Sequence, residues 1–275
     1  MLHAEYTEGA AGIDIGSRSI ELVVLSPTGE ITHQAKVPTT FAPLRQCREI
    51  LTGVRVRRIT ATGYGRKLFV ENGILNPCVA ITEIQAYALG AAKLYPEART
   101  VLDIGGQDTK VISLGSEGRV LKFEMNDRCA AGTGKFLEIM ATSLQVPIEE
   151  FGDFALAADK QVQISSMCAV FAESEATSLM GRGEQPQNIA MGLHLAIVER
   201  TMAMLSRVGL EQPLCFAGGV AHNRCVITLL EERLKERIIV PTEPDMVGAL
   251  GAARYGLRKG IGQQGMFDVT KERNK

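Results

Sequence analysis

Two short loops that combine an aspartate with a glycine are the residues best suited to chemistry in this sequence. Asp14 and Asp103 each end an apolar run, and each is followed two residues later by a glycine, Gly16 or Gly105. Glycine lets backbone N–H groups approach phosphate oxygens closely, and an aspartate at a strand end can hold a hydrated Mg²⁺ ion. One such loop is more often only a tight turn. Two copies together with a third glycine loop, Phe216–Asn223, predict a nucleotide site.

Two of the six cysteines lie in stretches of unusual composition. Cys129 lies in Glu124–Met140, which at first sight suggests a P-loop, but that motif requires a glycine where Cys129 stands and a Ser or Thr where Phe136 stands. Cys129 and Cys168 each come directly before a predicted helix, where unpaired N–H donors and the positive end of the helix dipole would favour a thiolate. No C-x-x-C pair exists, so a zinc or cluster site within one chain has weak local support. The other cysteines, which we interpret as small buried hydrophobes, are Cys47, Cys78, Cys215 and Cys225.

A unit of strand, acidic glycine turn and returning strand must position these loops, and it occurs twice. Strands are predicted at 12–16, 20–25 and 31–38, again at 100–104, 109–114 and 120–125, and singly at 57–63, 161–165, 214–216 and 238–240. Helices are predicted at 40–53, 82–94, 130–144, 147–157, 169–180, 188–208, 225–235 and 246–255. We interpret the repeated unit as an internal duplication of two similar domains.

The composition is that of an ordinary soluble protein. The chain has 275 residues, 45% of them hydrophobic, and 30 basic side chains against 31 acidic ones. This balance gives no general electrostatic attraction for nucleic acid or membranes, so we expect neither as a partner. No apolar run reaches the 18 or more residues of a membrane span, and the N-terminus lacks the pattern of a signal peptide. A cytoplasmic location is the simplest expectation.

The three glycine loops, in this order, resemble those of the actin/Hsp70/sugar-kinase superfamily. The resemblance implies an α/β fold of two duplicated ribonuclease-H-like lobes with a nucleotide cleft between them. The first lobe would comprise residues 1–93 and 247–275, and the second residues 94–246. Glu83–Ala91 and Asp245–Ala252 resemble the two interdomain helices of that superfamily, whose small residues allow close crossing.

The two cysteine stretches, Asp127–Gly134 and Ser165–Glu175, together with Asp103–Asp108, resemble a narrower family. They look like the activator ATPases of 2-hydroxyacyl-CoA dehydratases and the related ATPase components of benzoyl-CoA reductases, the BadF/BadG/BcrA/BcrD type. The resemblance implies a homodimer in which Cys129 and Cys168 of each copy hold one [4Fe–4S] cluster, and four thiolates are the usual requirement of such a cluster. It further implies ATP or ADP with Mg²⁺ as ligands, and an ATPase that drives a low-potential electron from the cluster to a dehydratase. Reduced ferredoxin or flavodoxin would reload the cluster.

The expected roles follow from the resemblance and from the chemistry of each side chain. Asp14 and Asp103 would position Mg²⁺, Gln107 and Asp108 would orient the attacking water, and Glu83 is a second candidate for the base. The residues expected to surround the phosphates are Gly16, Ser17, Arg18, Ser19, Gly105 and Gly106. Those expected to line the adenosine site are Gly218, Gly219 and Asn223.

One departure and several alternatives remain open at this point. Family members commonly carry a lysine where this chain has Glu21, so either Glu21 points away from the phosphates or Arg18 supplies the missing charge. The partner could also be a benzoyl-CoA-type reductase or a double-cubane cluster protein. A sugar or N-acetylhexosamine kinase and a non-enzymatic, actin-like or chaperone-like switch share the fold, but they give Cys129 and Cys168 no role.

Overall fold

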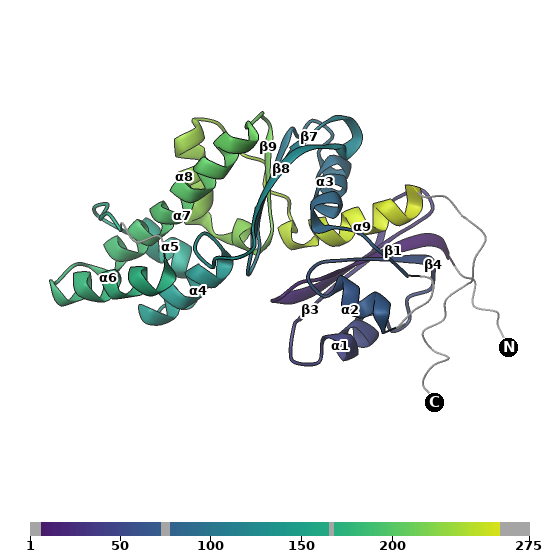
Figure 1. The fold of residues 1–275 in the computed structure, drawn as a ribbon, viewed down its shortest axis with the longest axis horizontal. Helices are drawn as coiled ribbons and strands as arrows, with labels where there is room; N and C mark the ends of the chain where they lie inside the picture. The colour runs from purple at the N-terminus through teal and green to yellow at the C-terminus, as the bar shows by residue number, and fades with distance from the viewer. Residues whose placement is uncertain (1–6, 73–77, 165–167, 259–275) are drawn as a thin grey trace. The chain divides into compact units, whose positions relative to one another are not determined.

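The chain divides into two compact units. A computed structural model describes residues 7–72, 78–164 and 168–258. The first unit comprises residues 1–97, 115–120 and 245–275, and the second comprises residues 98–114 and 121–244 (Figure 1). The lobe boundaries at 93/94 and 246/247 that the sequence suggests remain predictions. Each unit is built on its own mixed β-sheet.

The first unit contains a five-stranded sheet with the order β3-β2-β1-β4-β5. Its strands are β1 (Thr7–Ile15), β2 (Ser19–Leu25), β3 (Ile31–Pro38), β4 (Val56–Thr62) and β5 (Cys78–Ala80). The first three strands pair antiparallel, whereas β4 runs parallel to β1 and β5 parallel to β4. Alternation along the strands sends one set of apolar side chains to each face of the sheet.

Helices cover both faces of this first sheet. The helices α1 (Pro43–Ile50) and α2 (Arg66–Glu71) share one hydrophobic cluster with alternate residues of β1 and β2. On the other face, α9 (Val247–Arg258) follows the short 3₁₀ turn η3 (Pro244–Met246) and packs with the remaining residues of β2. The helix α3 (Glu83–Leu94) crosses α9 so closely that a Cβ on Gly251 would overlap the carbonyl of Ala86. Small residues therefore decide how these two helices meet, as their sequence predicted.

The second unit repeats the scheme with a four-stranded sheet of order β8-β7-β6-β9. Its strands are β6 (Thr100–Ile104), β7 (Thr109–Leu114), β8 (Val120–Asn126) and β9 (Leu214–Ala217), and the 3₁₀ turn η1 (Ser116–Gly118), which belongs to the first unit, joins β7 to β8. The helices are α4 (Gly134–Ser143), α5 (Phe151–Leu156), α6 (Ala169–Gly181), α7 (Pro186–Val208) and α8 (Arg224–Leu234), and the 3₁₀ turn η2 (Gly219–His222) precedes α8. Again β6 pairs antiparallel with β7 and parallel with β9, which is the arrangement of β1 with β2 and β4.

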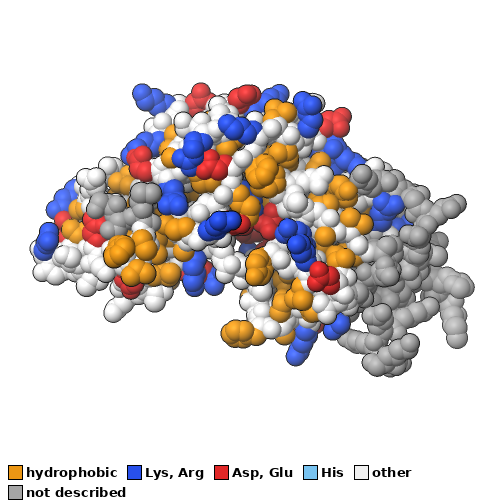
Figure 2. Space-filling model, in the orientation of Figure 1, with side chains coloured by type: hydrophobic (Ala, Val, Ile, Leu, Met, Phe, Trp, Pro, Cys, Tyr) orange, Lys and Arg blue, Asp and Glu red, His pale blue; other side chains and the backbone are white. Residues whose placement is uncertain are grey.

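The long helix α7 is the centre of the second hydrophobic core. Proline at its first position and Gly209 in the left-handed region at its end agree with the usual helix limits. Its length and composition would allow it to cross a membrane, but more than half of its most apolar stretch is buried within the protein. On the face drawn in Figure 2, basic and acidic side chains are interspersed.

Most predicted elements are present, but several differ from the structure. The helix predicted at 40–53 is confined to Pro43–Ile50, and α2 and β5 were not predicted. The strand predicted at 238–240 is a single bridge between Ile239 and Cys215. Residues 161–164 form no strand, and residue 165 lies outside the described ranges. The helix predicted from residue 130 begins only at Gly134.

Candidate functional site

The first Asp–Gly loop is a tight hairpin between β1 and β2. The amide of Gly16 donates to the carbonyl of Ser19 at 3.0 Å, which closes the turn. Asp14 ends β1 and is 5% exposed. Its carboxylate lies directly against backbone, because a Cβ on Gly63 or on Gly248 would overlap one of its oxygens. Gly63 also has φ +87°, which other residues adopt only with strain. These glycines therefore keep the space that the carboxylate occupies.

The second loop repeats this geometry residue by residue. The amide of Gly105 donates to the carbonyl of Asp108 at 2.9 Å, five residues after Asp103, just as Ser19 lies five residues after Asp14. Gly218 follows the parallel strand β9 as Gly63 follows β4, has φ +83°, and would overlap Asp103 Oδ1 if it carried a Cβ. The two sites are thus duplicates, in agreement with the repeated unit that the sequence contains.

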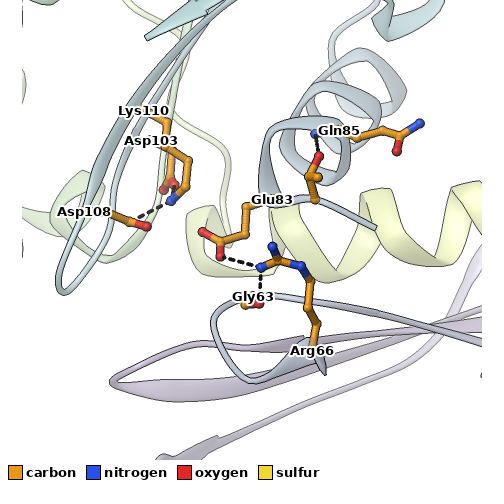
Figure 3. Close-up of polar contacts among 8 residues, drawn as sticks. Gly63, Arg66, Glu83, Gln85, Asp103, Asp108 and Lys110 are labelled. Carbon is orange, nitrogen blue, oxygen red and sulfur yellow. Dashed lines mark hydrogen bonds and ion pairs between the residues drawn. The ribbon is translucent and has the colours of Figure 1, made fainter. Parts of the chain in front are cut away.

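A buried lysine joins the two aspartates of the second loop. Lys110, 2% exposed, places its Nζ 2.9 Å from Asp103 Oδ2 and 2.6 Å from Asp108 Oδ1 (Figure 3). Lys110 is not among the residues that the sequence pattern singles out. The turn that starts at Gly105 sets Lys110 opposite Asp103 in the antiparallel register, and that pairing could have identified it. The carboxylate of Asp108, a candidate for orienting water, is therefore already held by a cation.

At the equivalent position of the first loop the chain has an acid instead of a lysine. Glu21 is the register partner of Asp14, as Lys110 is of Asp103, and it is likewise 5% exposed. Directly opposed residues of antiparallel strands project from the same face, so Glu21 shares the face of Asp14 and does not point away from it. On its other side Glu21 is paired with Lys36, whose Nζ bonds Asp245 Oδ2 at 2.7 Å.

Oxygen donors gather around Asp14. Thr62 on β4 is its parallel register partner, and the hydroxyl of Thr62 is fully buried with no hydrogen-bond partner among the described residues. A buried hydroxyl of this kind is costly unless something satisfies it. Carboxylate and hydroxyl oxygens, with water, are the ligands that Mg²⁺ accepts. The residues present here therefore fit the ion that the sequence predicts.

Glu83 is tied to a neighbouring loop of the first unit. Arg66 donates from Nη1 to the carbonyl of Gly63 at 2.7 Å and lies 3.5 Å from Glu83 Oε1 (Figure 3). The hydroxyl of Thr82 accepts from the amide of Gln85 and caps α3, which places Glu83 in the first turn. Glu83 thus lies beside the glycine that supports Asp14, and its role as a base stays a prediction.

The third glycine loop leads into a buried polar contact. Asn223 caps α8, since its Oδ1 accepts from the amide of Val226 at 3.1 Å. Its Nδ2 lies 3.0 Å from Nε2 of His194, whose Nδ1 lies 2.7 Å from the carbonyl of Ala190. Burial lowers the pKa of His194 from 6.5 to about 4, so the ring is neutral and accepts through Nε2. Both ends of the Asn223 amide are therefore engaged within the second unit, which leaves Gly218 and Gly219 as the backbone of the predicted adenosine loop.

The two singled-out cysteines are free thiols in different settings. Cys168 is exposed and is the N-cap residue of α6, as expected. Cys129 is half-buried, but it lies five residues before α4, so its placement at a helix start was wrong. The reason is tertiary, because the first amides of α4 donate to the loop carbonyls of Gly105 and Gly106. The helix-dipole argument therefore applies to Cys168 alone.

Three of the remaining cysteines are buried, and Cys78 is half-buried. Burial raises the pKa of Cys47, Cys78 and Cys225 to about 12, and Cys215 is buried. Such groups stay protonated, whereas a metal ligand must be a thiolate. Within residues 7–72, 78–164 and 168–258, no cluster of three or more His, Cys, Asp or Glu side chains could hold a metal ion inside one chain.

Solved structures first define the class of protein. The chain superimposes with a TM-score of 0.84 on component A of the (R)-2-hydroxyglutaryl-CoA dehydratase of Acidaminococcus fermentans, at 37% identity over 91% of this chain and 98% of that one. The activator of the 2-hydroxyisocaproyl-CoA dehydratase from Clostridium difficile, with bound ADPNP, gives a TM-score of 0.82 at 35% identity, over 93% and 95%. A ROK family glucokinase from Streptomyces griseus, at 13% identity and a TM-score of 0.59, shares the fold alone. The fold is that of the actin/Hsp70/sugar-kinase class, as predicted.

Within this class, the chain belongs to the BadF/BadG/BcrA/BcrD ATPase family, whose family model matches residues 11–256. The 2-hydroxyisocaproyl-CoA dehydratase activator of Clostridioides difficile is 35% identical, in an alignment that covers 96% of this chain and 97% of that protein. The (R)-2-hydroxyglutaryl-CoA dehydratase activating ATPase of Acidaminococcus fermentans is 37% identical, over 90% and 96%. One component of the benzoyl-CoA reductase of Thauera aromatica is 31% identical, over 90% and 92%. The family assignment made from the cysteine stretches is confirmed.

Proposed function

We propose that this protein is an ATP-dependent activator that delivers a low-potential electron from a [4Fe–4S] cluster to a 2-hydroxyacyl-CoA dehydratase. The observation that carries the proposal is the combination of two duplicated Asp–Gly hairpins with two accessible cysteines in one chain. The hairpins suit a Mg²⁺-nucleotide, and the cysteines suit a redox group. Activators of such dehydratases are 35% and 37% identical to the chain over nearly all of its length.

The residues of the hairpins have distinct tasks in this proposal. Asp14 and Asp103, each kept in place by a glycine, hold Mg²⁺ through their carboxylates. Lys110 keeps the two acids of the second loop close together and balances their charge. The backbone amides of the two turns hold the phosphates. Gln107 and Asp108 orient the attacking water, and Glu83 is the second candidate for that task.

Cys129 and Cys168 are the residues that fit the cluster. Cys129 is half-buried and Cys168 is exposed, and a [4Fe–4S] cluster takes four thiolates, so two copies of the chain would share one cluster. Val170 and Phe171, close behind Cys168, are each 66% exposed, and a second copy would cover them. The cluster, when bound, supplies the electron. Cys129 and Cys168 of each copy would hold the cluster.

The partners follow from this chemistry. They are a second copy of the chain, a dehydratase that carries its own iron–sulfur clusters, and a reduced ferredoxin or flavodoxin, all in the cytoplasm. A benzoyl-CoA-type reductase is the second candidate acceptor, because one component of such an enzyme is 31% identical to this chain.

Anaerobic purification tests the proposal. We expect a brown protein with about four irons per dimer, which hydrolyses ATP and becomes colourless in Cys129→Ser while nucleotide binding is kept. Cys78→Ser, at another half-buried thiol, is the matched control and should stay brown. A colourless, iron-free wild-type protein that phosphorylates a sugar would overturn the proposal. Rapid transfer to a reductase but not to any dehydratase would favour the second acceptor.

A further inference from the structure

The segment that carries Cys129 is bonded to the second Asp–Gly loop. The amide of Gly134 donates to the carbonyl of Gly105 at 2.9 Å, and the amide of Lys135 donates to the carbonyl of Gly106 at 2.8 Å. These donors are the first amides of α4, which a helix leaves without a partner inside itself. The start of α4 therefore cannot shift relative to this loop without losing both bonds.

The same two peptide units turn their other side toward the place where phosphate is expected. A trans peptide is planar, and its C=O and N–H point in opposite directions. Because the carbonyls of Gly105 and Gly106 face α4, the amides of Gly106 and Gln107 face away from it. An anion that binds these amides would thus act on the same rigid planes that hold α4.

A side chain makes the third bond and brings the connection close to Cys129. Thr109 begins β7, is 2% exposed, and donates from Oγ1 to the carbonyl of Gly132 at 2.6 Å. Gly132 lies three residues after Cys129. Between them the turn is held by Asn126, whose Nδ2 donates to the carbonyls of Cys129 and Ala131 at 3.0 and 3.2 Å.

We propose that Thr109 is a positioning residue that transmits the nucleotide state of the 105–108 loop to the Cys129 segment. The proposal rests on the proposed function for the identity of the ligand, a nucleotide phosphate, and for the role of Cys129. Thr109 directly follows Asp108, so a movement of the loop moves its hydroxyl. Its bond to Gly132 passes that movement to a short, hydrogen-bonded turn. The backbone hydrogen bonds at the start of α4 position that helix, and the hydrogen bond of Thr109 positions the segment that carries Cys129.

The test uses full-length protein purified anaerobically. It compares the protein in the presence of MgADP with the same protein in the presence of MgADPNP. Amide hydrogen exchange of peptides that cover residues 127–133 is measured, together with the Kd for ADPNP and the iron content. We expect the exchange of this segment to differ between the two nucleotides by about fivefold or more in the wild type. In Thr109→Val, which keeps the shape but removes the hydroxyl, the difference should fall below about twofold, while the Kd stays within about threefold.

Two further variants make the result specific. Thr109→Ser keeps a hydroxyl and should restore the wild-type difference. Thr100→Val is the matched control, since Thr100 is also fully buried in this unit and donates to the carbonyl of Glu211 at 2.8 Å. It should respond as the wild type does.

Three results would overturn the inference: a wild-type response in Thr109→Val, an equal loss in Thr100→Val, or no nucleotide-dependent difference in the wild type. An iron-free protein that still shows the Thr109-dependent response would refute the proposed function and leave this inference standing. An iron-containing protein without that response would refute this inference and leave the proposed function standing.

Discussion

Replacing His194 tests whether the fold depends on a buried neutral histidine. The ring is fully buried in α7, its centroid lies 4.9 Å from that of Phe151, and its Nε2 accepts from the amide of Asn223. Burial lowers the pKa of the folded state to about 4, against 6.5 for the ordinary group. Between these values the unfolded chain binds more protons than the folded one, so the free energy of unfolding rises with pH. The stability that the neutral His194 ring contributes is fully present above pH 6.5 and is lost as the pH falls to 4.

The two pKa values set the size of the effect. At about 1.36 kcal/mol per pKa unit, values of 6.5 and about 4 correspond to about 3 kcal/mol in full. Between pH 7 and pH 5 the loss should be about 2 kcal/mol. Comparison of the wild type with a His194 variant isolates this part of the pH dependence, because the carboxylates are the same in both proteins.

The assay is urea unfolding followed by circular dichroism at several values between pH 5 and pH 7. His194→Gln cannot titrate there but can still accept from Asn223, so the difference from wild type should shrink by about 2 kcal/mol as the pH falls. His194→Phe should show the same pH effect, with a further cost of about 1–3 kcal/mol because the Asn223 amide loses its acceptor. A difference from wild type that stays constant from pH 7 to pH 5 would refute the reasoning.

Three other substitutions or reactions test separate parts of the site. Gly218→Ala should weaken ADPNP binding, measured by calorimetry, more than about tenfold, because the added Cβ would displace the carboxylate of Asp103. Gly209→Ala is the control, since Gly209 has a similar φ and no atom within 4 Å of the added Cβ. It should bind ADPNP normally and lower the free energy of unfolding by only about 1 kcal/mol. Lys110→Met should lower the free energy of unfolding by about 3–5 kcal/mol, since it removes the cation that pairs with the buried carboxylate of Asp103, and a loss below about 1 kcal/mol would contradict the ion-pair geometry. Cys47 and Cys225 should react with iodoacetamide at pH 8 about a thousandfold more slowly than an exposed thiol; rapid labelling of the folded protein, mapped by mass spectrometry, would be inconsistent with their burial.

Local chemistry made much of the site readable from the sequence. One aspartate followed by a glycine is more often only a tight turn, but two copies together with a third glycine loop predict a nucleotide site. The duplication was visible in the sequence, and the small residues of α3 and α9 indicated their close crossing. The two cysteine stretches identified the family that the comparisons confirm.

Only the tertiary structure decided what lies beside these residues. Lys110 becomes the partner of Asp103 through strand register, and Glu21 faces Asp14 through the same register in the first unit. The helix α4 begins at Gly134 and not at residue 130, because carbonyls distant in sequence accept hydrogen bonds from its first amides. Cys129 therefore lies outside the helix. Asn223 is held by His194 from another helix. The amino-acid sequence by itself thus determined which groups could do chemistry, since that depends on residue type and local spacing. Pairing, burial and charge depend on neighbours that only folding brings together.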